Sequence, residues 1–289
     1  MYVEQIENDT WIQWQGNQLQ ARMNKISNKS FIGLTDLYAA LVNPHLWALL
    51  AWYDIRQRYR RSVLGPFWVT ISTGIMIGTM GILWSVLFKN DMKSYLPFFA
   101  IGSVTWTFYS SQINEACMGF TQFESTIKQI RFPLGVYLLR ILTRNLIILG
   151  HNCLIIVLVL VVLRPTVTWH AWLAIPGLFL GSVAMFGISM IVSVFCTRFR
   201  DMPMIIQNIT TVLFYITPII WRPDALGTKH QWVADYNPLA HLIEIVRAPI
   251  VSGYFPLNSW IWSLATTFIL LILGVALQGR FRDRIAYWL

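Results

Sequence analysis

Residues 56–88 read RQRYRRSVLGPFWVTISTGIMIGTMGILWSVLF, a run with four arginines followed by an uncharged apolar stretch that begins at Phe67. The apolar stretch supplies the roughly twenty residues that a helix needs to cross the ~30 Å hydrocarbon core of a bilayer. Because Lys and Arg are retained on the cytoplasmic side of membranes, the arginines place the start of this helix at the cytoplasmic face. The stretch therefore predicts an integral membrane protein whose first crossing runs outward.

The composition of the whole chain agrees with this prediction. Hydrophobic residues make up 56% of the sequence and charged residues only 12%, whereas soluble domains have about 25% charged residues. The net charge of +9 comes from cations at the ends of apolar stretches rather than on one polar face, which argues against nucleic-acid binding. The three cysteines show no CxxC spacing, so neither a disulfide framework nor a zinc site is expected. The polar first thirty residues predict no cleavable signal peptide.

The same length criterion predicts an all-α membrane protein with six transmembrane helices. With the amino terminus placed inside, sixteen of the 22 Lys and Arg residues fall on the cytoplasmic side, which predicts that both termini are cytoplasmic. The second span contains Gln112, Asn114 and Glu115, so it is expected to face protein or water rather than lipid. Residues 1–35 are expected to form a cytoplasmic extension, and residues 36–289 the transmembrane domain. The predicted spans are residues 67–88, 96–117, 134–163, 171–195, 204–221 and 260–277.

Three segments outside the spans also have distinctive patterns. Residues 46–61 mix leucines with four arginines and predict an amphipathic helix in the cytoplasmic interface, which either anchors the chain or moves with the first span. Residues 119–132 predict a short amphipathic helix that either lies in the interface or docks a cytoplasmic partner. Residues 222–259 are interrupted by Pro and Gly, and their apolar part, residues 241–251, is too short to cross a bilayer. A re-entrant or interfacial hairpin on the outer, periplasmic side is therefore expected.

The chain has no motif for chemistry of its own. It lacks a GxxxxGK[ST] phosphate loop, an HExxH motif, a cluster of metal ligands and a Ser/His/Asp constellation. Its five histidines are far apart, and His151 falls within a predicted span, where it either packs between helices or relays protons. The sequence thus predicts no catalytic residue, no metal and no cofactor in this chain, and a transport pathway that another subunit drives.

Four short motifs carry more specific information when they are taken together. They are RRSVLGPFW at residues 60–68, RFRDMP at 198–203, FYITPIIW at 214–221 and YNPL at 236–239. In this order and spacing, over about residues 35–289, the chain resembles the permease subunit of type 2 ABC exporters of polysaccharides.

The resemblance implies a homodimer that associates with two separate ATP-binding subunits, which hold the ATP and the magnesium. It implies export of a polyprenyl-linked polysaccharide, such as O-antigen, capsule or teichoic acid, across the bacterial cytoplasmic (inner) membrane. An exporter of a lipid, drug or peptide on the same scaffold, and a membrane channel or scaffold without a pump, are the alternatives. The amino-terminal extension is longer than in many relatives.

The resemblance also implies roles for three segments. Residues 46–61 become the gate helix, and the outer hairpin becomes part of the exit. Residues 119–132 become the coupling helix that the ATPase contacts. The candidate coupling residues are Phe120, Phe123, Ile127, Lys128 and Arg131.

Two further sets of residues are candidates for contact with the substrate. Arg binds phosphate in a bidentate manner, so the pyrophosphate of the carrier is expected at the gate helix, although plain anchoring at the positive face explains the same residues. A path for a hydrated sugar chain needs polar groups and aromatic faces, although aromatic residues also form interfacial belts. The carrier candidates are Tyr59, Arg58, Arg60 and Arg61. The pathway candidates are Trp68, Ser72, Thr73, Trp106, Tyr109, Gln112, Gln207, Asn208, Thr211 and Tyr215.

Overall fold

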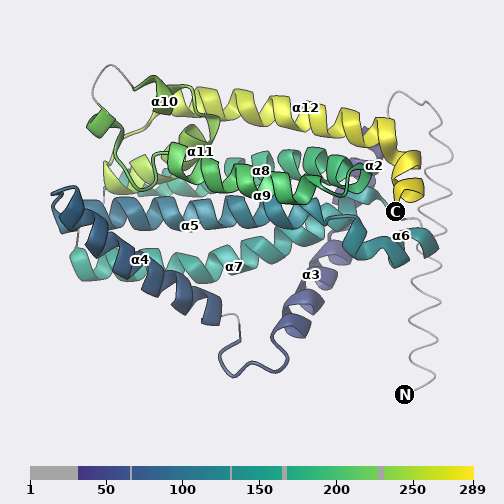
Figure 1. The fold of residues 1–289 in the computed structure, drawn as a ribbon, viewed down its shortest axis with the longest axis horizontal. Coiled ribbons are helices and arrows are strands. Elements are labelled where there is room, and N and C mark those ends of the chain that lie inside the picture. Colours follow the sequence, from purple (N-terminus) through teal and green to yellow (C-terminus); the bar gives the residue numbers. More distant parts are fainter. Residues whose placement is uncertain (1–31, 66, 131, 165–167, 227–230) are drawn as a thin grey trace.

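The computed structural model describes residues 32–65, 67–130, 132–164, 168–226 and 231–289, and Figure 1 shows how their helices are arranged. All regular structure within these ranges is helical, so the predicted all-α class is confirmed. Pro66, Arg131 and most of the predicted amino-terminal extension, residues 1–31, lie outside the described residues.

Four helices of the described chain are long and apolar enough to cross a membrane, by length and composition. The long helix α5 (Met92–Cys117) is too polar to meet this criterion, and the apolar helix α9 (Met202–Ile216) has only 15 residues. Both correspond to predicted spans, so the helices exist where six crossings were expected. The four that meet the criterion are α4 (Phe67–Leu87), α7 (Leu134–Leu163), α8 (Ala174–Arg198) together with the short 3-10 helix η3 (Trp169–Leu173), and α12 (Leu257–Trp288).

Helix boundaries agree with the prediction for some spans and differ for others. The bounds of α7 are those predicted. Helix α9 ends before the predicted boundary at residue 221, because Thr217 is extended and the residue before a proline, here Pro218, avoids the helical region. Helix α12 continues past the predicted end at residue 277, since the Gln and Arg residues that follow are good helix formers.

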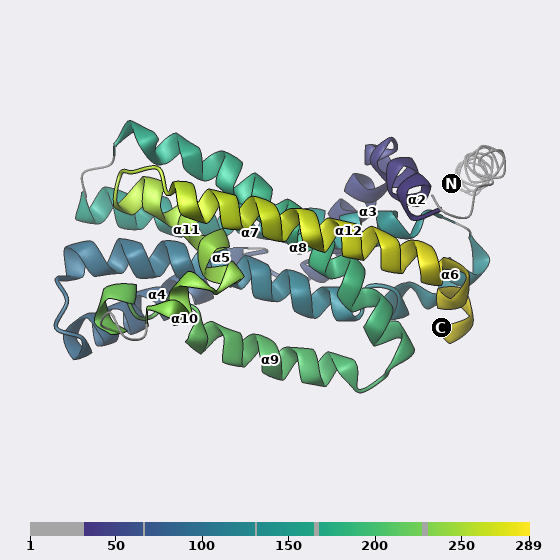
Figure 2. The same cartoon turned by 90° about the horizontal axis from the view of Figure 1, so that it is seen from above.

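Helix α5 lies at the centre of the bundle. Helices α4, α7, α8, α9 and α11 (Pro238–Val251) pack against it, and most of its side chains are buried. Tyr95 stacks on Phe99 with ring centroids 6.0 Å apart, and its hydroxyl donates to the carbonyl oxygen of Ile220 at 2.6 Å. In the view of Figure 2, α7 and α9 lie on opposite sides of the bundle. The prediction that the second span faces protein is therefore confirmed.

The chain enters the bundle through two helices, α2 (Ile32–Leu41) and α3 (Pro44–Arg58). Helix α3 corresponds to the predicted amphipathic helix at residues 46–61. Figure 1 shows that it slopes away from the bundle and that the chain then turns back into α4. Gly65 lies in this turn with φ +56°, a left-handed conformation that glycine adopts without the steric cost of a Cβ.

Helix α2 is attached to the bundle by one buried carboxylate. Asp36 accepts a hydrogen bond from the backbone N–H of Gly135 at 3.2 Å and forms an ion pair with Arg282 of α12 at 3.0 Å. Burial raises the pKa of the Asp36 carboxyl above its usual value, and the nearby Arg282 guanidinium opposes this rise. The attachment joins α2 to both α7 and α12.

The segment predicted as a hairpin contains α10 (Trp232–Asp235) and the 14-residue α11. In Figure 1, α10 lies at the end of the bundle opposite α6 (Glu124–Gln129) and the carboxyl terminus. Helix α11 is largely buried against α5, α8 and α12. Its start is fixed by the Asn237 side chain, which accepts from the N–H groups of Leu239 and Ala240 at 3.0 and 3.3 Å and donates to Thr217 Oγ1 at 3.0 Å.

Arg247 holds α11 against the start of α5. Its side chain is only 3% exposed, donates to the carbonyl oxygen of Pro218 at 2.6 Å and pairs with Glu244. Its guanidinium lies 3.9 Å from the ring centroid of Phe98. A buried arginine with a carbonyl, a carboxylate and an aromatic face as partners is satisfied in the interior.

Replacing the helix cap of α11 should destabilise the protein measurably. Asn237→Ala removes the acceptor for two backbone N–H groups and the bond to Thr217, so we expect a loss of about 1–2 kcal/mol in the free energy of unfolding in detergent. Asn208→Ala, at an exposed position of α9, is the matched control and should change stability by less than about 0.5 kcal/mol. Equal stability of both variants would contradict the capping role.

Candidate functional site

A polar groove lies between α4, α5 and α9 and encloses about 340 Å³. Ser103, Thr107, Ser110 and Asn114 line it from α5, where steps of three and four residues place them along one side of the helix. The other walls come from α4 and α9. The remaining lining residues are Met76, Trp106, Gln207, Thr210, Thr211 and Phe214.

Most hydroxyl groups of the groove donate to backbone carbonyls of their own helices. Thr107 donates to the carbonyl oxygen of Ser103 at 2.8 Å, Ser110 to that of Thr107 at 3.2 Å, and Thr211 to that of Gln207 at 3.0 Å. Each hydroxyl oxygen keeps lone pairs that accept hydrogen bonds. The groove therefore presents mostly acceptors from its hydroxyls, together with the amide groups of Asn114 and Gln207.

Two polar oxygens of the groove lack a protein partner among the described residues. They are Ser103 Oγ and Asn114 Oδ1, both buried. One wall is aromatic, since the rings of Trp106 and Phe214 lie with centroids 5.9 Å apart. The hydroxyl and amide groups beside these aromatic faces are suited to a ligand that carries hydroxyl groups on a partly apolar ring.

The structure brings some of the predicted pathway residues together. Those that line the groove are Trp106, Gln207 and Thr211. Trp68 and Ser72 are exposed on α4 at one-turn spacings before Met76, so they continue the same face of this helix. Asn208 and Tyr215 are exposed on α9 but do not line the groove. The prediction missed the small polar residues of α5, namely Ser103, Thr107 and Ser110. Their spacing of three and four residues along one helix face was the only sign of them in the sequence.

Three other pathway candidates are buried in the structure. These are Thr73, Tyr109 and Gln112. The Tyr109 hydroxyl donates to the carbonyl oxygen of Leu242 in α11 at 3.0 Å. The Gln112 side chain donates to Ser189 Oγ of α8 and accepts from Asn145 Nδ2 of α7, both at 2.9 Å. Tyr109 and Gln112 therefore join α5 to its neighbours.

A second cavity, of about 530 Å³, lies between α3, the turn before α4, and α7. Among the carrier candidates, Tyr59 and Arg60 line it, whereas Arg58 is turned away and pairs with Glu115 at 3.3 Å. Arg61 is exposed outside the lining. The other lining residues are Trp52, Ile55, Arg56, Gly65, Ile147 and His151. Arg56 was not among the carrier candidates, although it belongs to the same arginine run.

His151 packs between helices at this cavity. Its Nδ1 lies 2.8 Å from the carbonyl oxygen of Ile147, which identifies Nδ1–H as the donor. The ring of Phe67 meets it edge to face with centroids 5.2 Å apart. These contacts favour the packing role over a proton relay.

The predicted coupling helix consists of η2 (Thr121–Phe123) and α6. Phe120 and Ile127 are buried, and Phe123 stacks on Tyr137 of α7 with centroids 5.4 Å apart. Lys128 is exposed and pairs with Glu124 at 2.6 Å. The apolar side chains therefore attach the segment to its own bundle. The side chains left exposed are polar: Gln122, Glu124, Ser125, Lys128 and Gln129.

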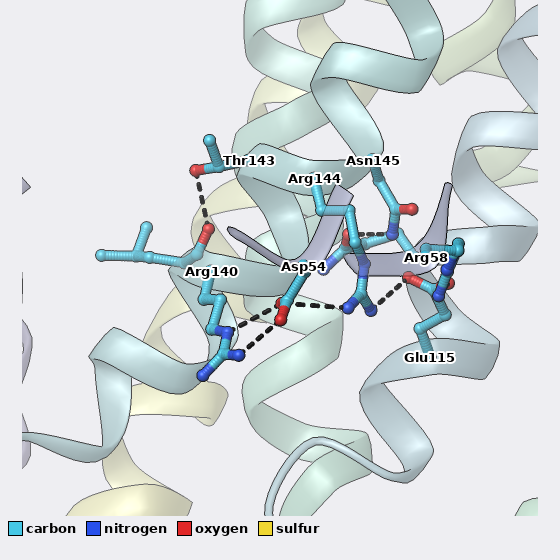
Figure 3. A network of polar contacts seen from close by, with 9 residues as sticks. Asp54, Arg58, Glu115, Arg140, Thr143, Arg144 and Asn145 are labelled. Atoms are coloured by element: carbon cyan, nitrogen blue, oxygen red, sulfur yellow. Dashed lines mark hydrogen bonds and ion pairs between the residues drawn. The ribbon is translucent and has the colours of Figure 1, made fainter. Parts of the chain in front are cut away.

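A chain of ion pairs joins α3, α7 and α5 (Figure 3). Arg140 of α7 holds both carboxylate oxygens of Asp54 of α3, with its Nε 2.7 Å from Oδ2. Arg144, one turn along α7, bonds Asp54 at 3.2 Å and Glu115 of α5 at 2.9 Å. Glu115 in turn pairs with Arg58. Helix α3 is thus fixed to two helices of the bundle by alternating charges.

Comparison with known proteins places the chain among transporters. The family model described as "ABC-2 type transporter" matches residues 45–251. The O-antigen export system permease protein RfbA of Klebsiella pneumoniae is 28% identical over 236 residues, which cover 81% of this chain and 90% of that protein. The Myxococcus xanthus RfbA is 19% identical over 76% of this chain and 85% of its own length. The polysialic acid transport protein KpsM of Escherichia coli is 21% identical, with coverages of 78% and 88%.

The buried amide of α5 and the amide of α9 in the groove should respond differently to substitution. Gln112→Ala removes the acceptor of the buried Asn145 amide and the donor to Ser189 Oγ, so we expect a loss of about 1–3 kcal/mol in the free energy of unfolding. Gln207→Ala in the groove should stay within about 0.5 kcal/mol of the unmodified protein. Denaturant unfolding in detergent measures both. A Gln112→Ala variant as stable as the unmodified protein would contradict the packing role of this residue.

Proposed function

The chain belongs to the ABC-2 type transporter family, and on this premise we propose that it is the membrane permease subunit of an ATP-driven exporter of lipid-linked polysaccharide. The observation that carries the proposal is the polar groove of α4, α5 and α9. A hydrated sugar chain that crosses a bilayer exchanges water for polar and aromatic surfaces, because unpaired polar groups are costly in hydrocarbon. The groove offers both kinds of surface.

In this proposal α4, α5, α7, α8, α9 and α12 are six crossings of the bacterial inner membrane, and both termini are cytoplasmic. Helix α5 is acceptable as a crossing because its Tyr109 and Gln112 bond to neighbouring helices instead of facing lipid. The short α9 is continued by residues 217–220, which are buried. The excess of Lys and Arg on one side of this arrangement supports the orientation.

A second copy of the chain would complete the groove. Helices α4 and α9 border it and expose large apolar side chains, among them Ile75, Ile209 and Val212. Packing of two such faces against each other would convert an open groove into an enclosed conduit. The homodimer would bind two ATP-binding subunits, which hold the ATP and magnesium, through the polar face of α6.

The cavity between α3 and α7 is suited to the pyrophosphate of a polyprenyl carrier. Arg56 and Arg60 supply planar donors that bind phosphate oxygens in pairs, and Tyr59 adds a hydroxyl. Trp52 and Ile147 give the cavity an apolar wall for the first part of the lipid chain. Since α3 lies before the first crossing, the headgroup would be held at the cytoplasmic face.

Deletion of the gene in its host tests the function. We expect surface polysaccharide to disappear and lipid-linked glycan to accumulate on the cytoplasmic side, with both effects reversed by the intact protein together with its ATPase. Normal surface polysaccharide in the deletion strain would contradict the proposal and favour an exporter of a lipid, drug or peptide. Full complementation without any ATPase would favour an unpumped channel.

Filling the groove should block export selectively. Ser110→Trp places an indole in the groove and removes a hydroxyl, so we expect glycan export by the reconstituted complex to fall by about tenfold or more, equivalent to 1.4 kcal/mol in the barrier. Val162→Trp, at an exposed position of α7, is the size-matched control and should export normally. Binding of the ATPase to both variants shows that they are folded. Unchanged export by Ser110→Trp would remove the groove from the pathway.

The carrier cavity makes a separate prediction. Arg60→Gln removes a phosphate donor from the cavity, so we expect a higher KM for the lipid-linked glycan with little change in kcat. Arg61→Gln removes an exposed arginine next to it that does not line the cavity, and should leave the KM unchanged. Glycan-stimulated ATP hydrolysis measures both. Equal effects of the two substitutions would indicate general attraction to the positive surface instead of a site.

A further inference from the structure

One arginine contacts both the coupling segment and the gate helix. The Cζ atom of Arg140 lies 4.3 Å from the ring centroid of Phe123, and the same guanidinium holds both carboxylate oxygens of Asp54. Phe123 belongs to η2, next to α6, and Asp54 belongs to α3. Two cytoplasmic segments that are far apart in the sequence are thus joined through one side chain of α7.

The geometry of this contact makes it stiff. The guanidinium lies over the phenylalanine ring and donates to the carboxylate, so its position is set from two directions. Phe123 also stacks on Tyr137, one turn before Arg140 on α7, which limits the sliding of its ring. The side chains of Arg140 and Asp54 are only 15% and 13% exposed, so water screens their interaction weakly.

The contact continues along α3 to the carrier cavity. Arg144 also holds Asp54, and Glu115 holds Arg58, one turn further along α3. The next residues, Tyr59 and Arg60, line the cavity of about 530 Å³. A displacement of Asp54 would therefore move the end of α3 that carries the cavity residues.

We propose that Arg140 is a positioning residue that transmits displacement of the coupling segment, residues 120–129, to the gate helix α3. The proposal rests on the proposed function, because it requires an ATPase that moves the coupling segment and a substrate held beside α3. Arg140 itself touches neither the nucleotide nor the glycan. Through the contacts of Arg140, a displacement of the coupling segment on ATP binding would also displace α3.

The test uses the full complex of permease and ATPase in proteoliposomes. Arg140→Lys keeps the positive charge but loses the planar fork and the flat face. We expect basal ATP hydrolysis within about twofold of the unmodified complex, and export and glycan-stimulated hydrolysis lowered about tenfold, in the range of couplings between distant sites. The matched control is Arg284→Lys, whose guanidinium lies 6.0 Å from the ring of Phe281 in the same helix and does not join two segments. It should export normally.

A double-mutant cycle distinguishes transmission from simple anchoring. Phe123→Leu keeps an apolar side chain but removes the aromatic face, so it should impair export by itself. If the two residues act in series, the double variant Phe123→Leu/Arg140→Lys should export at about the rate of the single variant that exports less. Effects on export that multiply would show independent roles and overturn the proposal, as would normal export by Arg140→Lys.

A distance measurement adds a readout that does not depend on export. Spin labels at Gln57→Cys on α3 and Ser125→Cys on α6, both exposed, are read with and without trapped ATP in a background whose native cysteines are replaced by alanine. We expect the two labels to shift together in the parent, so that their separation is kept, and to separate in Arg140→Lys. A constant separation in both would overturn the proposal. Absence of ATP-driven glycan export by the unmodified complex would instead refute the proposed function.

Discussion

The arrangement of the bundle depends on the burial of α5, a helix too polar to face lipid. Its Tyr95, Tyr109 and Gln112 carry groups that hydrocarbon cannot satisfy, and each finds a partner on another element. These bonds require α7, α8 and α11 to cover α5 closely. The remaining side is bordered by α4 and α9, and there the small polar residues of α5 meet a groove instead of another helix. The need of the polar side chains of α5 for hydrogen-bond partners thus explains both the packed interior and the open groove.

The sequence was sufficient for the existence and class of the helices. The length of the apolar stretches predicted α7 to the residue, and the polar character of the second span predicted its burial. The end of α9 was misplaced because the apolar residues 217–221 continue the pattern of composition, whereas Pro218 interrupts the helix. Local backbone preference prevailed over hydrophobicity at this boundary.

The candidate site was predicted less well, because composition does not give the rotation of a helix. Trp106 and Tyr109 are three residues apart on α5, yet one lines the groove and the other bonds to α11. The same limit applies to the coupling segment, whose amphipathic pattern was correct but whose apolar face packs on its own bundle. Partners such as Asp54 and Arg140 are distant in sequence, so no local signal indicated their contact. The arginines also differ in their surroundings. Arg247 is buried against Phe98 of α5, whereas Arg56 lines an open cavity.

The hydroxyls of the groove have a consequence for the range of glycans that the proposed exporter would accept. Thr107, Ser110 and Thr211 have their protons committed to carbonyls of their own helices, so they meet a passing sugar only as acceptors. Every hexose presents hydroxyl donors around its ring, whatever the configuration at each carbon. These hydroxyls would therefore accept hydrogen bonds from many different hexoses. The hydroxyls of the groove would thus allow sugar units of different stereochemistry to pass one after another.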